Sequence, residues 1–247
     1  QDHPEQYYQN IRESLWNNLR YKKDAGVPIY FFAKALNNHD LDRIHQQFIQ
    51  TPIAARIAAA LLMTLPGTPV IYYGDEIGMH QFATGNDEYR RAPMQWSAQE
   101  NAGFTTAKDA WIDRLDYLDK KWKDGWQQLT EKTSHTVEGQ HKEAGSTLNR
   151  VKQLIAQDNV IKHPTKITQY NYTGSALILK YEAEKEVRWV MINLNPSAET
   201  AFTVPSDIPL SQFDVLNKKI VQLSARATLT PGQLMVLRPF TTPQKEK

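Results

Sequence analysis

The first half of the chain alternates between helical and strand-like patterns of apolar residues. Apolar side chains at helical spacing predict an amphipathic helix over 8–19, and the β-branched and aromatic run at 27–33 predicts a buried strand. An Ala- and Leu-rich run predicts a second helix over 51–65, and the run TPVIYY at 68–73 predicts another buried strand. This order of elements is typical of a parallel α/β sheet whose strands are covered by crossover helices.

The second half of the chain begins with a long polar excursion and ends in strand-like runs. The stretch 80–145 is far longer than a usual connection, which indicates a functional or inserted segment. Helical periodicity returns at Leu148 and runs up to a stop at His163-Pro164, which predicts the final helix of the α/β part. Beyond Pro164, short strand-like runs predict a small antiparallel sandwich or barrel, with strands at 176–181, 187–194 and 234–240. We therefore divide the chain into an α/β part, 1–165, and an all-β domain, 166–247.

The composition narrows the classes of partner. Lys and Arg number 29 against 27 Asp and Glu, and no long block of one sign is present, which argues against a nucleic-acid arm or a polybasic membrane patch. No apolar run approaches the roughly 20 residues of a membrane span. Cysteine is absent, which excludes disulfides, thiolate metal ligands and cysteine nucleophiles. The pattern favours an uncharged partner, with neither nucleic acid nor membrane.

A polar motif, Asn38-His39-Asp40-Leu41-Asp42-Arg43, follows the predicted strand at 27–33. In α/β barrels, polar residues at the carboxyl ends of parallel strands face the active site, because the βα loops converge there. This placement makes Asp40 a candidate functional residue. The simpler interpretation is a turn in which Asp40 caps the next helix, and these residues alone leave both interpretations open.

Three segments carry a more specific signal because they occur together and in order: FFAKALNNHDLDR at 31–43, LPGTPVIYYGDEIGM at 65–79 and YRRAPMQW at 89–96. Together they resemble the α-amylase family of glycoside hydrolases, with its NHDxxR and RxPMQW motifs. The resemblance implies the C-terminal portion of a (β/α)8 TIM barrel, in which 68–73 is the eighth strand and the strand before Asn37 is the seventh. It also implies that the tail is the small antiparallel β-sandwich domain that follows the barrel.

The family's chemistry is retaining cleavage of α-glucosidic bonds through an oxocarbenium-like transition state. By resemblance, the substrates are α-1,4-linked starch-like glucans or maltooligosaccharides, and Asp40 is the catalytic carboxylate that stabilises the transition state. The same resemblance implies substrate binding by His39, Asn38, Arg43 and Arg91. The family's nucleophile and acid motifs do not occur in this chain, so we expect them in the remaining N-terminal part of the barrel and expect this chain alone to be inactive.

Several of these residues have a second, structural interpretation. Arg43 fits either substrate contact or pairing with a nearby carboxylate such as Asp42. Asp75 and Glu76 fit a sugar subsite, but bracing of the loops through hydrogen bonds is the favoured interpretation. Trp96 could present a face to a sugar ring, although a packed tryptophan under a long loop is more common. A set of aromatic residues in the excursion is either a glucan-stacking platform or a satellite core, namely Trp111, Tyr117, Trp122 and Trp126.

Other functions stay open at this point. Within the same clan the alternatives are an α-glucosidase, an oligo-1,6-glucosidase or a trehalose-forming transglycosidase, and outside it a noncatalytic carbohydrate-binding protein with the same fold. No metal site is assigned in this chain, and calcium is a candidate only for the complete enzyme. We expect an extracellular or periplasmic location because polymeric substrates are met there, with a cytoplasmic maltodextrin enzyme as the alternative. The polar opening without a leader predicts that the natural N-terminus lies upstream.

Overall fold

A computed structural model describes residues 13, 33–43, 52–81, 85–107, 133–156, 159–170 and 174–240. The chain forms two compact units. The α/β unit consists of residues 34–63 and 69–155, and the β unit consists of residues 1–33, 64–68 and 156–247. Helix α8 (Asn159–Lys162), which precedes the boundary predicted at residue 165, belongs to the β unit and packs against β4 (Ala176–Ala183) and β5 (Glu186–Asn193). The helix predicted over 8–19 lies outside the described residues except for Glu13, which is helical.

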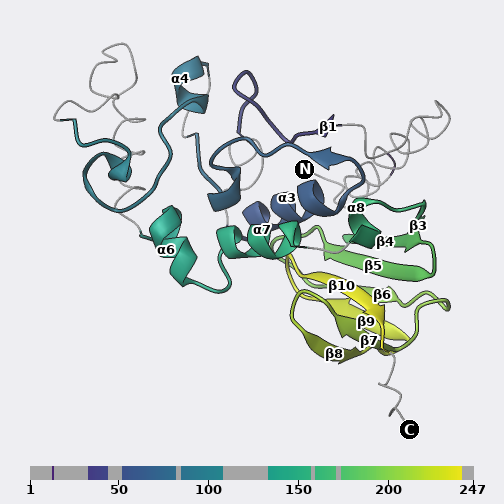
Figure 1. The fold of residues 1–247 in the computed structure, drawn as a ribbon. Coiled ribbons are helices and arrows are strands. Elements are labelled where there is room, and N and C mark those ends of the chain that lie inside the picture. The colour runs from purple at the N-terminus through teal and green to yellow at the C-terminus, as the bar shows by residue number, and fades with distance from the viewer. Residues whose placement is uncertain are drawn as a thin grey trace, which may run out of the picture. The chain divides into compact units, whose positions relative to one another are not determined.

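Helix α3 (Pro52–Thr64) confirms the predicted second helix (Figure 1). Its sequence is apolar on nearly every side, and Ala55, Ala60 and Leu62 are buried, which is the pattern of a helix enclosed by protein. The helix predicted from Leu148 to His163 is present in the described residues as two helices, α7 (Thr147–Ile155), which buries Val151 and Leu154, and α8 (Asn159–Lys162).

The two predicted parallel strands are much shorter than expected. They form a two-stranded sheet of β1 (Ala33–Lys34) and β2 (Thr68–Pro69), extended by one hydrogen bond of 2.8 Å from Val70 N to Lys34 O. Most of the strand predicted at 27–33 lies outside the described residues. The prediction of a buried strand over 68–73 was wrong beyond Pro69. Within the described residues the sheet supplies ladder partners only over this short length, Val70 is 47% exposed, and the chain then turns at Gly74.

Short helical turns occupy the described parts of the predicted excursion at 80–145. They are η2 (Asp75–Ile77) just before it, and then α4 (Asp87–Arg90), η3 (Glu100–Gly103), η5 (Thr133–His135) and α6 (Val137–Lys142). Helix α6 begins at a Thr136 cap, whose side chain accepts a 3.1 Å hydrogen bond from Gly139 N. Buried Gln140 joins α6 to its surroundings through bonds of 2.7 Å to Ile77 O and 3.0 Å from Leu148 N.

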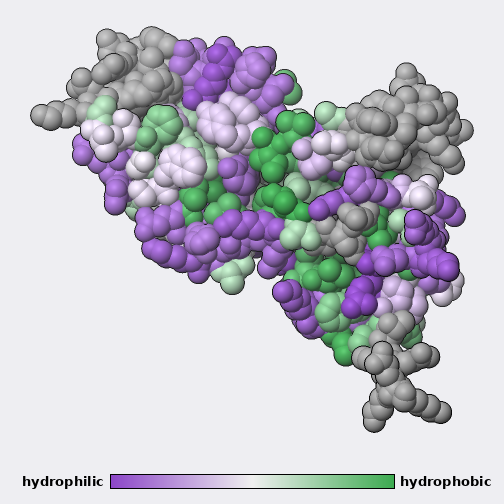
Figure 2. Space-filling view, viewed as in Figure 1, coloured by the Kyte–Doolittle hydropathy of each residue, from purple (hydrophilic) through white to green (hydrophobic). Residues whose placement is uncertain are grey.

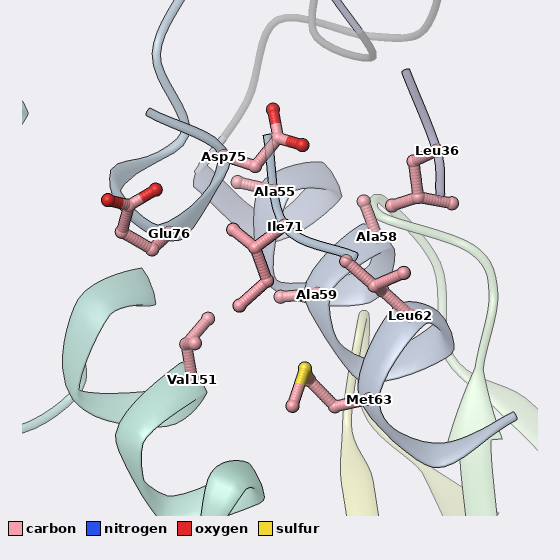
Figure 3. A pocket seen from close by; sticks show the side chains of 10 residues that line it. All are labelled: Leu36, Ala55, Ala58, Ala59, Leu62, Met63, Ile71, Asp75, Glu76 and Val151. Carbon is pink, nitrogen blue, oxygen red and sulfur yellow. The ribbon is translucent and has the colours of Figure 1, made fainter. Parts of the chain in front are cut away.

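A small apolar gap lies between α3, α7 and the segment after β2. It is lined mainly by aliphatic side chains, including Ala55, Leu62, Ile71 and Val151, and Figure 3 shows the carboxylates of Asp75 and Glu76 directed away from this lining. Its volume is about 10 Å³, room for about one water molecule. The gap is therefore a packing imperfection of the helix–helix core and not a ligand site.

The β unit contains two antiparallel sheets. The larger has the order β3-β4-β5-β10-β7-β8 and the smaller pairs β6 with β9. Strands β4 (Ala176–Ala183), β5 (Glu186–Asn193) and β10 (Leu234–Pro239) confirm the three predicted runs. The sequence did not predict the shorter or more polar strands, which are β3 (Lys166–Tyr170), β6 (Thr200–Thr203), β7 (Ser211–Asp214), β8 (Lys219–Gln222) and β9 (Arg226–Leu229).

One buried cluster joins the two sheets of the β unit. It combines side chains of the larger sheet, such as Trp189 and Met191, with Phe202 and Leu229 of the smaller one. Figure 2 shows hydrophobic and polar residues side by side on the visible face of this unit. Two sheets that share one apolar core form a sandwich, whereas the short strand-like runs beyond Pro164 had predicted either a sandwich or a barrel.

Candidate functional site

The loop after β1 is shaped by its own side chains. The carboxamide oxygen of Asn38 accepts hydrogen bonds from Asp40 N at 2.8 Å and Leu41 N at 3.0 Å, which makes an Asx turn. This turn satisfies two backbone donors and directs the chain past Asp40. Asn38 is thus engaged with the loop backbone through its oxygen, while the residue itself is exposed.

Asp40 carries an accessible carboxylate held by two neighbours. Its side chain is 65% exposed, and its two oxygens lie 3.2 Å from Arg91 Nη2 and 3.3 Å from His39 Nε2. Arg91 also donates to His39 O at 3.2 Å and pairs with Asp87 at 2.8 Å. Exposed ion pairs of this kind contribute little to stability. His39 and Arg91 therefore set the position and the charge surroundings of the Asp40 carboxylate more than they stabilise the fold.

Arg43 is the structural centre of this region. It is fully buried, and its guanidinium donates to Tyr73 O at 2.7 Å and to Arg90 O at 3.1 Å. The partner proposed from sequence, Asp42, instead accepts hydrogen bonds from Gln81 at 2.7 Å and Arg90 at 3.0 Å. Arg43 has no exposed surface for a substrate here, so its position favours the structural interpretation.

Two tyrosines enclose the Arg43 guanidinium. Its central carbon lies 4.6 Å from the Tyr72 ring centre and 4.8 Å from the Tyr73 ring centre, within cation–π range. The tyrosine hydroxyls donate to Arg90 O at 3.2 Å and to Ala92 O at 2.8 Å. Burial, followed by the neighbouring Tyr73, raises the pKa of Tyr72 to about 12, which keeps its hydroxyl protonated as a donor. The segments after β1 and β2 and the RRAP segment are therefore joined through one arginine.

Asp75 is a buried carboxyl beside this arginine. Its Oδ1 accepts a 3.0 Å hydrogen bond from Asn37 Nδ2 and lies 3.8 Å from Arg43 Nη1. Burial raises the pKa of Asp75 to about 6, and the Asn37 bond and the Arg43 charge only partly oppose this. These contacts favour the loop-bracing interpretation for Asp75 over a direct sugar contact.

Beside Arg91 an open pocket of about 450 Å³ is present. Glu76 and Arg91 supply charged groups to its wall, which also includes Tyr73, Met94, Trp96 and Phe104. Trp96 is 48% exposed. It is therefore not packed under the loop, which is the more common arrangement for such a tryptophan. The aromatic set expected at Trp111, Tyr117, Trp122 and Trp126 lies outside the described residues.

The tertiary structure brings together three of the five predicted site residues, His39, Asp40 and Arg91, with Asn38 in the turn beneath them. The sequence reasoning passed over Asn37, Gln81 and Arg90, which support the loop. Their polar side chains beside recognised motifs were the available signal. Among the described residues, no group of three or more His, Asp or Glu side chains is arranged to hold a metal ion.

The sequence profile described as "Alpha amylase, catalytic domain" matches residues 8–156. Because this match covers more than half of the chain, the protein belongs to the α-amylase family. None of the helices in the described segments combines the length and apolar character that a bilayer crossing requires.

Three similar proteins illustrate the range of this family. Alpha-amylase SusG of Bacteroides thetaiotaomicron is 36% identical over 85 residues, which is 34% of this chain and 12% of SusG. The amino acid transporter heavy chain SLC3A1 of Rattus norvegicus is 47% identical over 60 residues, 21% of this chain and 9% of that protein. The crystal structure of the alpha-glucosyl transfer enzyme XgtA matches with a TM-score of 0.70 at 20% identity and covers 94% of this chain and 43% of XgtA. This chain thus spans less than half the length of each, and the XgtA match supports the fold alone.

Proposed function

We propose that this chain is the C-terminal part of a retaining α-glycosidase that cleaves α-1,4-glucosidic bonds in starch-like glucans or maltooligosaccharides. The observation that carries the proposal is the accessible Asp40 carboxylate, held between His39 and Arg91 in the loop after β1. In the proposed layout β1 and β2 belong to the seventh and eighth strands of the barrel, and the β unit is the domain that follows it. An enzyme acting on polymers would work outside the cell or in the periplasm.

Asp40 has the properties that this role requires. Cleavage of the glucosidic bond develops positive charge on the sugar ring, and a fixed carboxylate stabilises that charge more than it stabilises the neutral ground state. Arg91 and His39 orient the carboxylate without sealing it, since 65% of its side-chain surface is exposed. The nucleophile and the acid would come from the N-terminal part of the complete enzyme, so this chain contributes electrostatic stabilisation and positioning.

The direct test is Asp40→Asn in the complete enzyme. We expect kcat on maltooligosaccharides to fall by about 100- to 1000-fold, because the variant keeps the shape of the side chain and removes its charge. Asp87→Asn is a matched control. Asp87 also pairs with Arg91, at 2.8 Å, but it lies in α4 and not in the loop that carries Asp40. Melting temperatures close to that of the wild-type enzyme would show that both variants fold. Wild-type turnover by Asp40→Asn would refute the proposed role.

A transglycosidase of the same clan is the second candidate, favoured by the 57% identity over 49 residues to the trehalose synthase/amylase TreS of Mycobacterium tuberculosis. The family's shared chemistry allows the glucosyl group to pass to water or to a sugar hydroxyl. Product ladders from the complete enzyme separate the two, because hydrolysis yields only shorter sugars whereas transfer also yields longer or rearranged ones. Intact nucleophile and acid motifs upstream would favour either enzyme over a noncatalytic carbohydrate-binding protein. The similarity to a transporter heavy chain keeps a noncatalytic role as a third candidate.

A further inference from the structure

The pocket beside Arg91 has the composition of a carbohydrate subsite. Three aromatic side chains in its wall keep large exposed fractions, with Tyr73 at 38%, Trp96 at 48% and Phe104 at 52%. Ligand pockets generally combine aromatic surface with a few polar groups that fix orientation. Here the polar groups are a carboxylate, Glu76, and a guanidinium, Arg91. Aromatic faces complement the C–H faces of a pyranose ring, and the two charged groups can bind its hydroxyls.

The two most exposed aromatic residues are held close together by a tight backbone turn. Trp96 N and Ser97 N both donate to Ala102 O, at 2.9 Å and 3.0 Å, and Phe104 N donates to Asn101 O at 2.9 Å. Asn101 and Ala102 adopt left-handed φ angles of 52° and 56°, an uncommon conformation for residues with a Cβ. The turn therefore fixes Trp96 and Phe104 before any ligand arrives, and backbone strain of this kind concentrates at binding sites.

The pocket and the Asp40 site share one wall. Arg91 lines the pocket and contacts Asp40 Oδ1 at 3.2 Å and His39 O at 3.2 Å. Tyr73 lines the same pocket, and its hydroxyl donates to Ala92 O, next to Arg91. A sugar ring in the pocket would thus be separated from the ring that Asp40 contacts by the Arg91 side chain alone. Two rings placed in this way fit neighbouring glucose units of one glucan chain.

We propose that Trp96 and Phe104 form a stacking subsite for a pyranose ring of an α-glucan, adjacent to the ring that Asp40 stabilises. This inference rests on the proposed function. The subsite sets how much each added glucose unit contributes to binding, while Asp40 acts on the bond that breaks. Loss of an aromatic face therefore weakens binding of chains long enough to reach the subsite and leaves the chemical step unchanged.

The test is the chain-length dependence of KM in the complete enzyme, measured with maltooligosaccharides of increasing length. For the wild-type enzyme, KM should fall sharply when the chain becomes long enough to fill the subsite. In Trp96→Ala and in Phe104→Ala, the drop in KM on filling the subsite should be about tenfold smaller than in the wild-type enzyme. The reason is that burial of one aromatic face is lost, while kcat should be retained. Trp96→Phe keeps an aromatic face and should restore much of the fall in KM with chain length. Ile155→Ala, which removes a side chain of equal 48% exposure outside the pocket, should behave as wild type.

The outcomes separate this inference from the function on which it rests. If Asp40→Asn is inactive but both alanine variants keep the wild-type fall in KM, the stacking subsite is refuted and the glycosidase proposal stands. If Asp40→Asn retains full activity, the proposed function itself fails. A loss of kcat that is equal for all chain lengths, with a lowered melting temperature, would mean that Trp96 is structural and would also overturn the subsite. Phe104→Ala repeats the test if Trp96→Ala does not fold.

Discussion

The guanidinium of Arg43 lies 4.6 Å from the centre of the Tyr72 ring, and this contact is completely buried on the arginine side. The same guanidinium donates to two backbone carbonyls, those of Tyr73 and Arg90, which belong to different segments of the α/β unit. One side chain thus fixes the spacing between the segment that follows β2 and the segment that carries Arg91. Asp40 depends on this spacing because its partner Arg91 comes from the second of these segments.

Replacing Arg43 with lysine should destabilise the protein by about 3 kcal/mol. Lysine keeps the positive charge but cannot reach two carbonyls with a planar fork or stack on two rings. Chemical denaturation of wild type and Arg43→Lys measures the difference in the free energy of unfolding. The same substitution at exposed Arg226 is the control and should change it by less than about 0.5 kcal/mol. Equal effects at the two positions would contradict the bracing role of Arg43.

Gly74 is required for both its backbone conformation and its lack of a side chain. Its φ is +90°, and a Cβ there would lie 2.7 Å from Met79 Sδ and 3.0 Å from Arg43 Nη1. We expect Gly74→Ala to cost about 3 kcal/mol, combining left-handed strain with overpacking. Thermal melting of three alanine variants separates these contributions. Gly85→Ala, with φ +111° and open space, should cost only the strain of about 1 kcal/mol, and Gly145→Ala, with open space alone, should be near neutral. A neutral Gly74→Ala would disprove the close contact.

Because of Asp75, the protein should become less stable as the pH rises from about 4 to about 6. Burial raises the pKa of Asp75 from 3.8 to about 6 in the folded state, so in this window the folded protein holds a proton that the unfolded chain has released. The unfolding free energy therefore falls as pH rises, by about 3 kcal/mol over the whole window, and this contribution is fully present only below about pH 4. Denaturation of wild type and Asp75→Asn at several pH values isolates the effect, because asparagine does not titrate. Parallel stability curves for the two proteins would contradict the prediction.

The groups around Asp75 shift its pKa in opposite directions. Arg43 at 3.8 Å opposes the rise in the pKa, and the neighbouring carboxylate Glu76 adds to it. The Asn37 amide donates to the carboxylate and also opposes the rise. Asparagine at position 75 can still accept the hydrogen bond from Asn37, so the two proteins differ chiefly in charge.

Local patterns in the sequence were sufficient for the elements whose burial is continuous along the chain. Helix α3, the start of helix α7 and strands β4, β5 and β10 were predicted within a few residues, because a buried helix or a central strand repeats its apolar positions at a fixed period. The short strands β6 to β9 carry too few apolar residues for such a signal. Their pairing, such as Phe202 opposite Ala227, depends on a partner elsewhere in the chain.

The family was also determined by the sequence alone, because three motifs of fixed spacing carried the resemblance and the catalytic-domain profile agrees with it. Only the tertiary structure decided which motif residues support the site and which remain exposed within it. Arg43 and Asp40 stand three positions apart, yet one is fully buried and the other is largely exposed. Asp40 and its partner Arg91 are 51 positions apart and meet only in the tertiary structure, where Arg43 donates to the carbonyl of Arg90, next to Arg91. Burial and charge pairing are properties of that three-dimensional arrangement, and no local spacing encodes them.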